Sequence, residues 1–88
     1  MHAVIFEVQI VDRESATSNL RDNIVPTAAE APGIVAGYWT DIGDDRGVSM
    51  IVFDSEDAAR SYMNSGDPPP PELVKMVRRE IGEVVAHT

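Results

Sequence analysis

The chain of 88 residues carries 15 acidic against seven basic side chains and has a net charge of −8. At this length we expect a single domain spanning residues 1–88, for which oligomerisation would be a way to gain buried core. A surface of this sign repels phosphate backbones, which argues against nucleic acid as a partner. The absence of cysteine excludes a disulfide scaffold, a thiolate metal site and a cysteine nucleophile.

The first residues lead directly into an apolar run, with neither a basic segment nor a small-residue cleavage site before it. That run is too short to cross a membrane. We therefore expect a cytoplasmic protein with no membrane partner.

Residues 2–11, HAVIFEVQIV, alternate in the manner of a β-strand. Both faces of this strand carry apolar side chains: Val4, Phe6, Val8 and Ile10 on one, Ala3, Ile5, Glu7 and Gln9 on the other. We expect Glu7 and Gln9 to be buried at a subunit interface and to form hydrogen bonds across it. A buried Glu7 would also have a raised pKa and could act as a base.

Residues 12–31 place apolar side chains at helical spacing, and Asp12 or Ser15 could cap the start of that helix. Pro26 lacks a backbone donor and clashes with the preceding turn, which predicts a kink or a break. Asn23 lies just before this proline, where a freed backbone carbonyl could give its amide a structural partner. The helix is expected to end at the Pro32–Gly33 step.

Two further strands, 33–42 and 47–53, are joined across GDDR. A two-residue loop (Asp44 and Asp45) and a four-residue loop give the same pairing, with Trp39 near Met50 and Tyr38 near Ile51. Adjacent residues of a strand point to opposite faces, so one of Tyr38 and Trp39 should face the helices and the other a partner's sheet. The sequence does not decide whether Tyr38 or Trp39 is the one that faces the helices.

A second helix is predicted from residue 54, with Asp54 or Ser55 as its cap and with Tyr62 and Met63 on its core-facing stripe. GDPPPP (66–71) predicts a rigid extended connector. We expect a short helix over 71–79 and a final strand over 80–88.

The resulting order, β-α-β-β-α-β, is the ferredoxin-like split βαβ unit of the α+β class, with a four-stranded antiparallel sheet and helices on one face. Such a sheet must hide its other face or make it polar. Because the expected strands carry apolar side chains on both faces, we expect a homodimer through the open sheet face.

The segment PGIVAGYW, which follows a proline-bearing helix, and the segment VFDSEDAARSY after the hairpin resemble the dimeric α/β-barrel superfamily, in particular its antibiotic biosynthesis monooxygenase-like branch. Members of that superfamily include cofactor-independent monooxygenases of polycyclic aromatic substrates, haem-degrading proteins and muconolactone isomerases. The resemblance implies a pocket between sheet and helices. By residue type it makes Tyr38, Trp39 and Asn23 the candidates for binding substrate and stabilising a carbanion-like intermediate.

Cofactors and metals are not expected. The haem degraders bind iron through a histidine of the first long helix, and residues 12–31 contain none. His2 and His87 lie near the ends of their strands and would approach each other if those strands were neighbours. Two histidines without a carboxylate at motif spacing make a poor metal site. Surface positions or a proton-transfer role remain for them.

These observations favour a cofactor-independent monooxygenase-like protein that binds a small aromatic or apolar substrate between sheet and helices. The alternatives are a non-catalytic small-molecule-binding or assembly module of the same fold, and a muconolactone-type isomerase with Glu7 as its only candidate base. A methyl-filled helix-facing side would exclude the enzyme. A cavity there, lined by Asn23 and one of the two aromatic residues, would support it.

Overall fold

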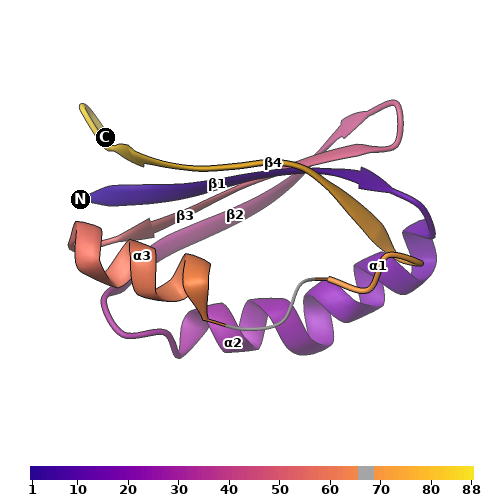
Figure 1. The fold of residues 1–88 in the computed structure, drawn as a ribbon, viewed down its shortest axis with the longest axis horizontal. Coiled ribbons are helices and arrows are strands. Elements are labelled where there is room, and N and C mark those ends of the chain that lie inside the picture. The colour runs from indigo at the N-terminus through magenta and orange to yellow at the C-terminus, as the bar shows by residue number, and fades with distance from the viewer. Residues whose placement is uncertain (66–68) are drawn as a thin grey trace.

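The computed structural model describes residues 1–65 and 69–88. Its elements follow one another in the expected order (Figure 1): β1 (His2–Ile10), α1 (Arg13–Asn19), the π-helical turn η1 (Leu20–Ile24), α2 (Val25–Ala29), β2 (Ile34–Gly43), β3 (Arg46–Phe53), α3 (Glu56–Asn64) and β4 (Val74–Glu83). The α+β, ferredoxin-like β-α-β-β-α-β fold is confirmed.

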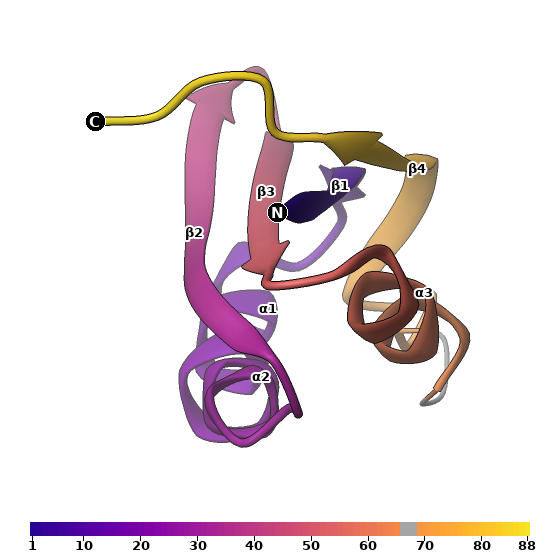
Figure 2. The ribbon, with the colours of Figure 1, turned by 90° about the vertical axis from the view of Figure 1, so that its left-hand side faces the viewer.

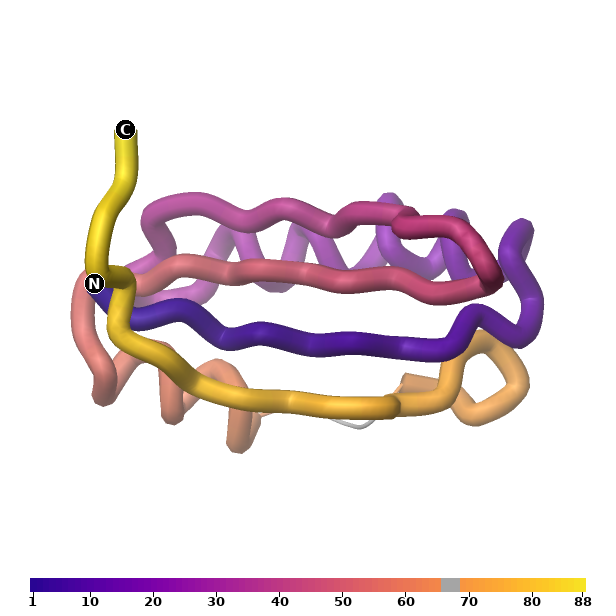
Figure 3. The backbone as a smooth tube through the Cα atoms, turned by 90° about the horizontal axis from the view of Figure 1, so that it is seen from above, coloured from indigo at the N-terminus to yellow at the C-terminus, as the bar shows by residue number. Residues whose placement is uncertain are grey.

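The four strands form one sheet in the order β2-β3-β1-β4, and every neighbouring pair is antiparallel. All helices lie on the same face of this sheet, and the other face is bare (Figure 2). The continuous helical segment α1-η1-α2 runs beneath the β2 edge, while α3 lies beneath the β4 edge (Figures 2 and 3). The helix-facing side of the central strands is therefore flanked by helices on both sides.

The first helical segment starts where its sequence predicts, and it changes to a π turn just before Pro26. The Asp12 side chain accepts a hydrogen bond from the backbone N–H of Ser15 at 3.1 Å, so Asp12 is the cap. Pro26 lies in the first turn of α2, immediately after η1. Because proline has no N–H to offer the preceding turn, the wider π turn accommodates the lost hydrogen bond, and the helix continues through it.

The second helix begins at Ser55, whose side-chain oxygen accepts from the backbone N–H of Ala58 at 3.1 Å. Gly33, just before β2, has φ +82° and lies against the start of this helix. A Cβ at Gly33 would sit 2.6 Å from Oδ1 of Asp54, so both the backbone conformation and the space require glycine here.

The core lies between the sheet and the helices. Val4, Ile51, Phe53 and Ala59 are almost fully buried, and partly buried apolar side chains pack around them, among them Phe6, Trp39, Tyr62, Met63 and Ile81. Tyr62 and Met63 thus contact the core as expected.

The end of the chain departs from expectation. Residues 71–73 form a turn and β4 runs from Val74 to Glu83, so the helix predicted over 71–79 is wrong, and the strand predicted over 80–88 contains only the last four residues of β4. Apolar residues at 73, 76 and 77 fit a helical turn locally, but pairing with β1 from Ile10 to His2 outweighs that local preference. Residues 66–68 of the predicted GDPPPP connector lie outside the described residues.

The hairpin also corrects a prediction. Asp44 and Asp45 form a two-residue turn, both with positive φ, as type I′ turns require. Ile42, however, is an extra residue in β2: Asp41 pairs with Gly47 and Gly43 with Arg46. This β-bulge shifts the register by one residue. The expected pairing of Trp39 with Met50 is therefore wrong: Trp39 pairs with Ser49, and Tyr38 pairs with Met50.

Candidate functional site

A cavity of about 1590 Å³ occupies the helix-facing side of the sheet, between the first helical segment and α3. Its described lining comes from all four strands and both helical regions. Drug-sized ligands occupy cavities of about 300–1,000 Å³, so this groove has room for a molecule of several rings. The space that the fold leaves here is not filled by methyl groups.

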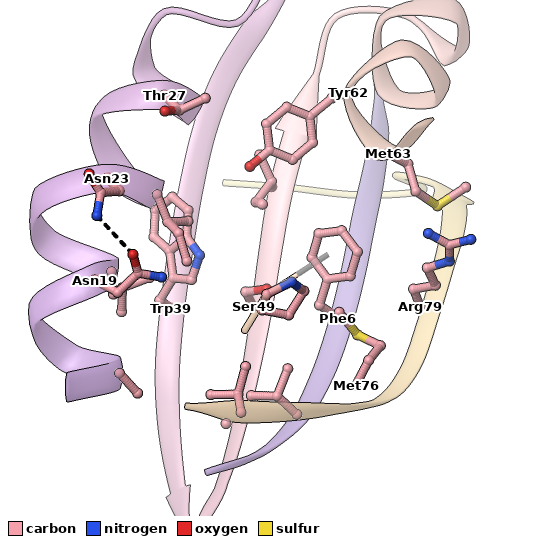
Figure 4. Close-up of a pocket in the computed structure, with 18 of the residues that line it drawn as sticks. Phe6, Asn19, Asn23, Thr27, Trp39, Ser49, Tyr62, Met63, Met76 and Arg79 are labelled. Atoms are coloured by element: carbon pink, nitrogen blue, oxygen red, sulfur yellow. Dashed lines mark hydrogen bonds between the residues drawn. The ribbon is translucent and has the colours of Figure 1, made fainter. Parts of the chain in front are cut away.

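Trp39 lines this groove and Tyr38 does not. The indole packs against the core cluster and faces the groove from β2 (Figure 4). Tyr38 is 66% exposed on the opposite face. A Cβ on Gly37 would lie 2.9 Å from the Trp39 ring, so the glycine leaves room for the indole beside the strand. The structure thereby assigns the two aromatic residues, which the sequence left open.

Asn23 reaches the same groove together with Asn19, which was not among the candidates that the sequence indicates. The Asn23 Nδ2 donates a hydrogen bond to Oδ1 of Asn19 at 2.8 Å (Figure 4). Asn23 therefore bonds to a side chain one turn earlier. The Asn19 amide nitrogen lies on the side of Trp39 (Figure 4), where it can act as a donor. The four-residue spacing of the two asparagines on a helix was the available signal.

Tyr62 contributes a hydroxyl to the groove. Its ring packs on Phe53, with the ring centroids 5.2 Å apart, and its oxygen points into the groove (Figure 4). Half-burial raises the pKa of Tyr62, so the phenol stays protonated and can donate a hydrogen bond. The helical spacing of Tyr62 predicts a core position for its ring. It gives no sign that the hydroxyl reaches a groove.

One cross-strand row forms the floor of the groove. The register places Trp39 beside Ser49, Ser49 beside Phe6, and Phe6 beside Arg79. These four side chains share the helix-facing side and are drawn together in Figure 4. The floor thus passes from an indole through a buried hydroxyl and a phenyl ring to a guanidinium group.

An ion pair lies at the hairpin end of the groove. Arg13 at the start of α1 binds the carboxylate of Asp41 and, at 3.3 Å, that of Asp45. A hydrogen bond from the backbone N–H of Gly43 and then the Arg13 guanidinium lower the pKa of Asp41. Arg13 and Asp41 therefore form an ion pair in which the two charges compensate each other.

Glu7 lies on the other side of the sheet. Its carboxylate is 3.0 Å from Arg46 and 3.7 Å from Arg78, and its side chain is 15% exposed in the single chain. It belongs to the open face, where the strand alternation predicts it, and it does not line the groove. A base in the groove cannot be Glu7.

The histidines occupy separate settings. His2 has its Nε2 3.7 Å from Oε1 of Glu56, and its buried Nδ1 has no partner among the described residues. His87 lies beyond the end of β4, next to Thr88. Within residues 1–65 and 69–88, no three histidine or carboxylate side chains come together as metal ligands do. No helix of the described chain has the length and apolarity of a membrane span.

Fold and site together define a split β-α-β-β-α-β protein with a ligand-sized groove between its sheet and its helices. Solved structures share this fold. HapK from Hahella chejuensis matches the whole of this chain and 96% of its own, with a TM-score of 0.67 and 13% identity. SnoaB from Streptomyces nogalater, a cofactor-independent oxygenase, matches 98% of this chain and 94% of its own, with a TM-score of 0.73 and 12% identity.

At these identities the likeness concerns the fold, and it confirms the fold that the sequence resemblance implies. No protein-family model matches the sequence, and no curated protein matches it significantly.

Proposed function

We propose that the protein is a cofactor-independent monooxygenase-like protein that holds a small aromatic or apolar substrate in the groove between sheet and helices. The observation that carries the proposal is that Trp39 and the Asn23–Asn19 pair line one cavity, as the enzyme requires and a packed core does not. The cofactor-independent oxygenase SnoaB shows that this fold can support such a reaction.

Each lining group has a part in holding the substrate. A planar ring system would stack against the Trp39 indole and the Phe6 ring, which aromatic pairs favour by about 0.5–1.5 kcal/mol beyond the area they bury. The Asn19 amide and the Tyr62 hydroxyl offer hydrogen bonds to a substrate oxygen. The groove between them is lined largely by apolar side chains, so these hydrogen bonds form in a medium that strengthens them.

The chemistry can then come from the substrate itself. A substrate such as anthrone gives up a proton from carbon to water and becomes an enolate, whose negative oxygen the Asn19 and Tyr62 donors stabilise. The enolate passes an electron to O₂ and the two radicals join as a peroxide anion. This anion takes a proton back from water to become a hydroperoxide, which then loses water. One oxygen atom ends in the new carbonyl and the other in water, so anthrone and O₂ give anthraquinone and H₂O. The protein supplies orientation.

A non-catalytic small-molecule-binding module is the second candidate, and one observation favours it. Among the described residues that line the groove there is no histidine or glutamate, and its two carboxylates are Asp41, which is paired with Arg13, and Asp57 in the first turn of α3. A binding protein needs no such group. The isomerase loses its support, because its only candidate base, Glu7, lies on the opposite face of the sheet.

We also propose that two copies pack through the open sheet faces. Tyr38 and Met50, paired across β2 and β3, are 66% and 45% exposed there. Beside them, Glu7 is held between Arg46 and Arg78. An apolar patch with a polar border of this kind is typical of a protein interface.

Oxygen uptake with anthrone and with a quinol tests the proposed reaction, measured against spontaneous oxidation without protein. Wild type should accelerate uptake. Trp39→Phe and Asn23→Ala should each slow it about tenfold or more, as misplaced substrate does. Tyr38→Phe, on the other face, is the matched control and should retain the wild-type rate.

Quenching of the fluorescence of Trp39, the single tryptophan, separates the two candidates. Quenching by anthrone without faster oxygen uptake would leave the binding module. The absence of both would overturn the groove as a ligand site.

A further inference from the structure

The arginines of this acidic protein are nearly all paired with carboxylates. Five of the six have a carboxylate oxygen within 4.0 Å: Arg13, Arg21, Arg46, Arg60 and Arg78. Arg79 has none within residues 1–65 and 69–88. Because the chain has 15 acidic side chains, carboxylates are not scarce. Arg79 differs from the other arginines because of its position in the fold.

Arg79 lies at the β4 edge of the groove. It neighbours Phe6 in the sheet register and lines the cavity beside Met63 of α3 (Figure 4). Met76 pairs with Val8, two residues along β1 from Phe6, and it lines the same side of the groove. Arg79 is an exposed residue at this edge of the groove, so its guanidinium is open to a ligand that lies on the neighbouring apolar and aromatic side chains.

The other charges of the groove lie elsewhere. Arg13 and Asp41 neutralise each other at the hairpin end. Asp57 belongs to the first turn of α3, six residues before Met63, which is about 9 Å along the helix axis. Within residues 1–65 and 69–88, Arg79 is therefore the charged side chain at the end of the groove beside Met63.

We propose that Arg79 makes the groove selective for an anionic aromatic ligand, one whose rings contact Trp39 and Phe6 and whose carboxylate or ionised enol binds the guanidinium. The proposal rests on the proposed function and names the substrate class. Trp39 and Arg79 stand three strand spacings apart, about 14 Å, which suits several fused rings with an acidic group at one end. The planar guanidinium can bind a carboxylate through two parallel hydrogen bonds.

The net charge of the protein shows why a single positive side chain in the groove matters for anion binding. A net charge of −8 repels an anion, so attraction to one must come from a local group. The neighbouring Arg78 cannot supply it, because it points to the open face and is held by Glu7 and Glu80.

Two probes of the same size and different charge test the proposal by calorimetry: 2-naphthoate and naphthalene-2-methanol. Wild type should bind the carboxylate about tenfold more tightly than the alcohol, as a charge-assisted hydrogen bond provides. Arg79→Gln should lose this preference and keep the affinity for the alcohol. Arg79→Lys should retain part of it. Lys75→Gln removes the same charge from β4 outside the groove and should keep the whole preference.

Three outcomes would overturn the proposal. Equal binding of both probes by wild type, or a preference that survives in Arg79→Gln, removes the anion selectivity and leaves the groove as a ligand site. No binding of either probe to wild type removes the groove and the selectivity together. Should Arg79→Gln fail to fold by circular dichroism, the salt dependence of the wild-type preference decides, because rising ionic strength must reduce it if a charge pair is its cause.

Discussion

The two faces of the sheet have similar apolar character in the sequence and very different surroundings in the fold. On the helix-facing side, Val4, Ile51 and Phe53 are at most 1% exposed. On the open side, Tyr38 and Met50 are largely exposed. The two faces differ in what covers them. Helices cover one face and leave a groove over it, whereas no helix covers the other face.

Adjacent residues show what this difference teaches. Tyr38 and Trp39 are sequence neighbours, yet one is on the open face and the other lines the groove. Arg78 and Arg79 repeat the division, since Arg78 pairs with two glutamates and Arg79 has none among the described residues. In a two-sided sheet, strand alternation gives chemically similar neighbours separate roles.

The largest effect should follow from opening the core on the helix-facing side. Phe53 is fully buried, and Phe53→Ala should lower the free energy of unfolding by about 3–5 kcal/mol, because it removes a large apolar side chain and leaves a cavity. Urea denaturation measures the change. Val85→Ala, at a position 92% exposed, is the control and should change stability by less than about 0.5 kcal/mol. Equal losses in both variants would contradict the core assignment.

On the open face, a charge should break the assembly and leave the fold intact. Met50→Asp would place a carboxylate in the apolar patch of the proposed dimer, where an unpaired buried charge costs about 2–5 kcal/mol. Sedimentation should show a dimer for wild type and a monomer for Met50→Asp, with unchanged circular dichroism. Val11→Asp, at an exposed position outside the strands, should remain dimeric. A wild-type monomer at micromolar concentration would refute the dimer.

Two glycines should respond to the same substitution with opposite signs. Gly33→Ala should destabilise the fold by about 1–3 kcal/mol, because its φ of +82° is strained for alanine and its Cβ would press on Asp54. Gly82→Ala, in β4 with nothing within 4 Å of its Cβ, should stabilise by up to about 1 kcal/mol by restricting the unfolded chain. Thermal unfolding of both variants gives the comparison, and a shift of the same sign in both would contradict it.

The smallest effect concerns the Tyr62 phenol. In a Tyr38→Phe variant, which retains Tyr62 as its only tyrosine, the phenolate absorbance should appear with a pKa above 10. The cause is burial, which disfavours the charged form.

The sign of its linkage to stability follows. The folded pKa is raised, so the stabilisation from the neutral phenol is complete below the unfolded pKa near 10 and is lost as pH rises through the folded value. Tyr62→Phe should therefore lose less stability than wild type in this alkaline range. A Tyr62 that titrates at or below the pKa of N-acetyltyrosinamide would disprove the environment described for it.

Much of the fold could be predicted from local pattern. The period of two predicted β1, and helical spacing predicted the segment from α1 to α2. The capping residues Asp12 and Ser55 were each one of two candidates. The faces of β2 relative to β3 could not be predicted, because the bulge at Ile42 has no signature in the sequence. The choice between Tyr38 and Trp39 depended on that one residue.

The site was harder to predict than the fold for a related reason. Residues 71–79 have an apolar spacing that fits a helix, so Arg79 was placed on an element that does not form. Only the pairing of β4 with β1, a contact between the two ends of the chain, brings Arg79 beside Phe6. Asn23 could be nominated by residue type, while its bond to Asn19 depended on the helix continuing through the π turn.

The strand β2 carries an extra residue on each side of its central segment, with register shifts between Ile34 and Ala36 and between Asp41 and Gly43. If the bulge moved from Ile42 to the other side of this segment, Ile42 would pair with Gly47 and Trp39 with Met50. The segment would then be turned over and would present the Tyr38 phenol to the ligand in place of the Trp39 indole. A sheet built this way can exchange the aromatic group in its binding site by moving a bulge, with every side chain of the segment unchanged. Across distant proteins of this fold, equivalent aromatic residues would then be found by matching sheet register, and a column-by-column alignment would miss them.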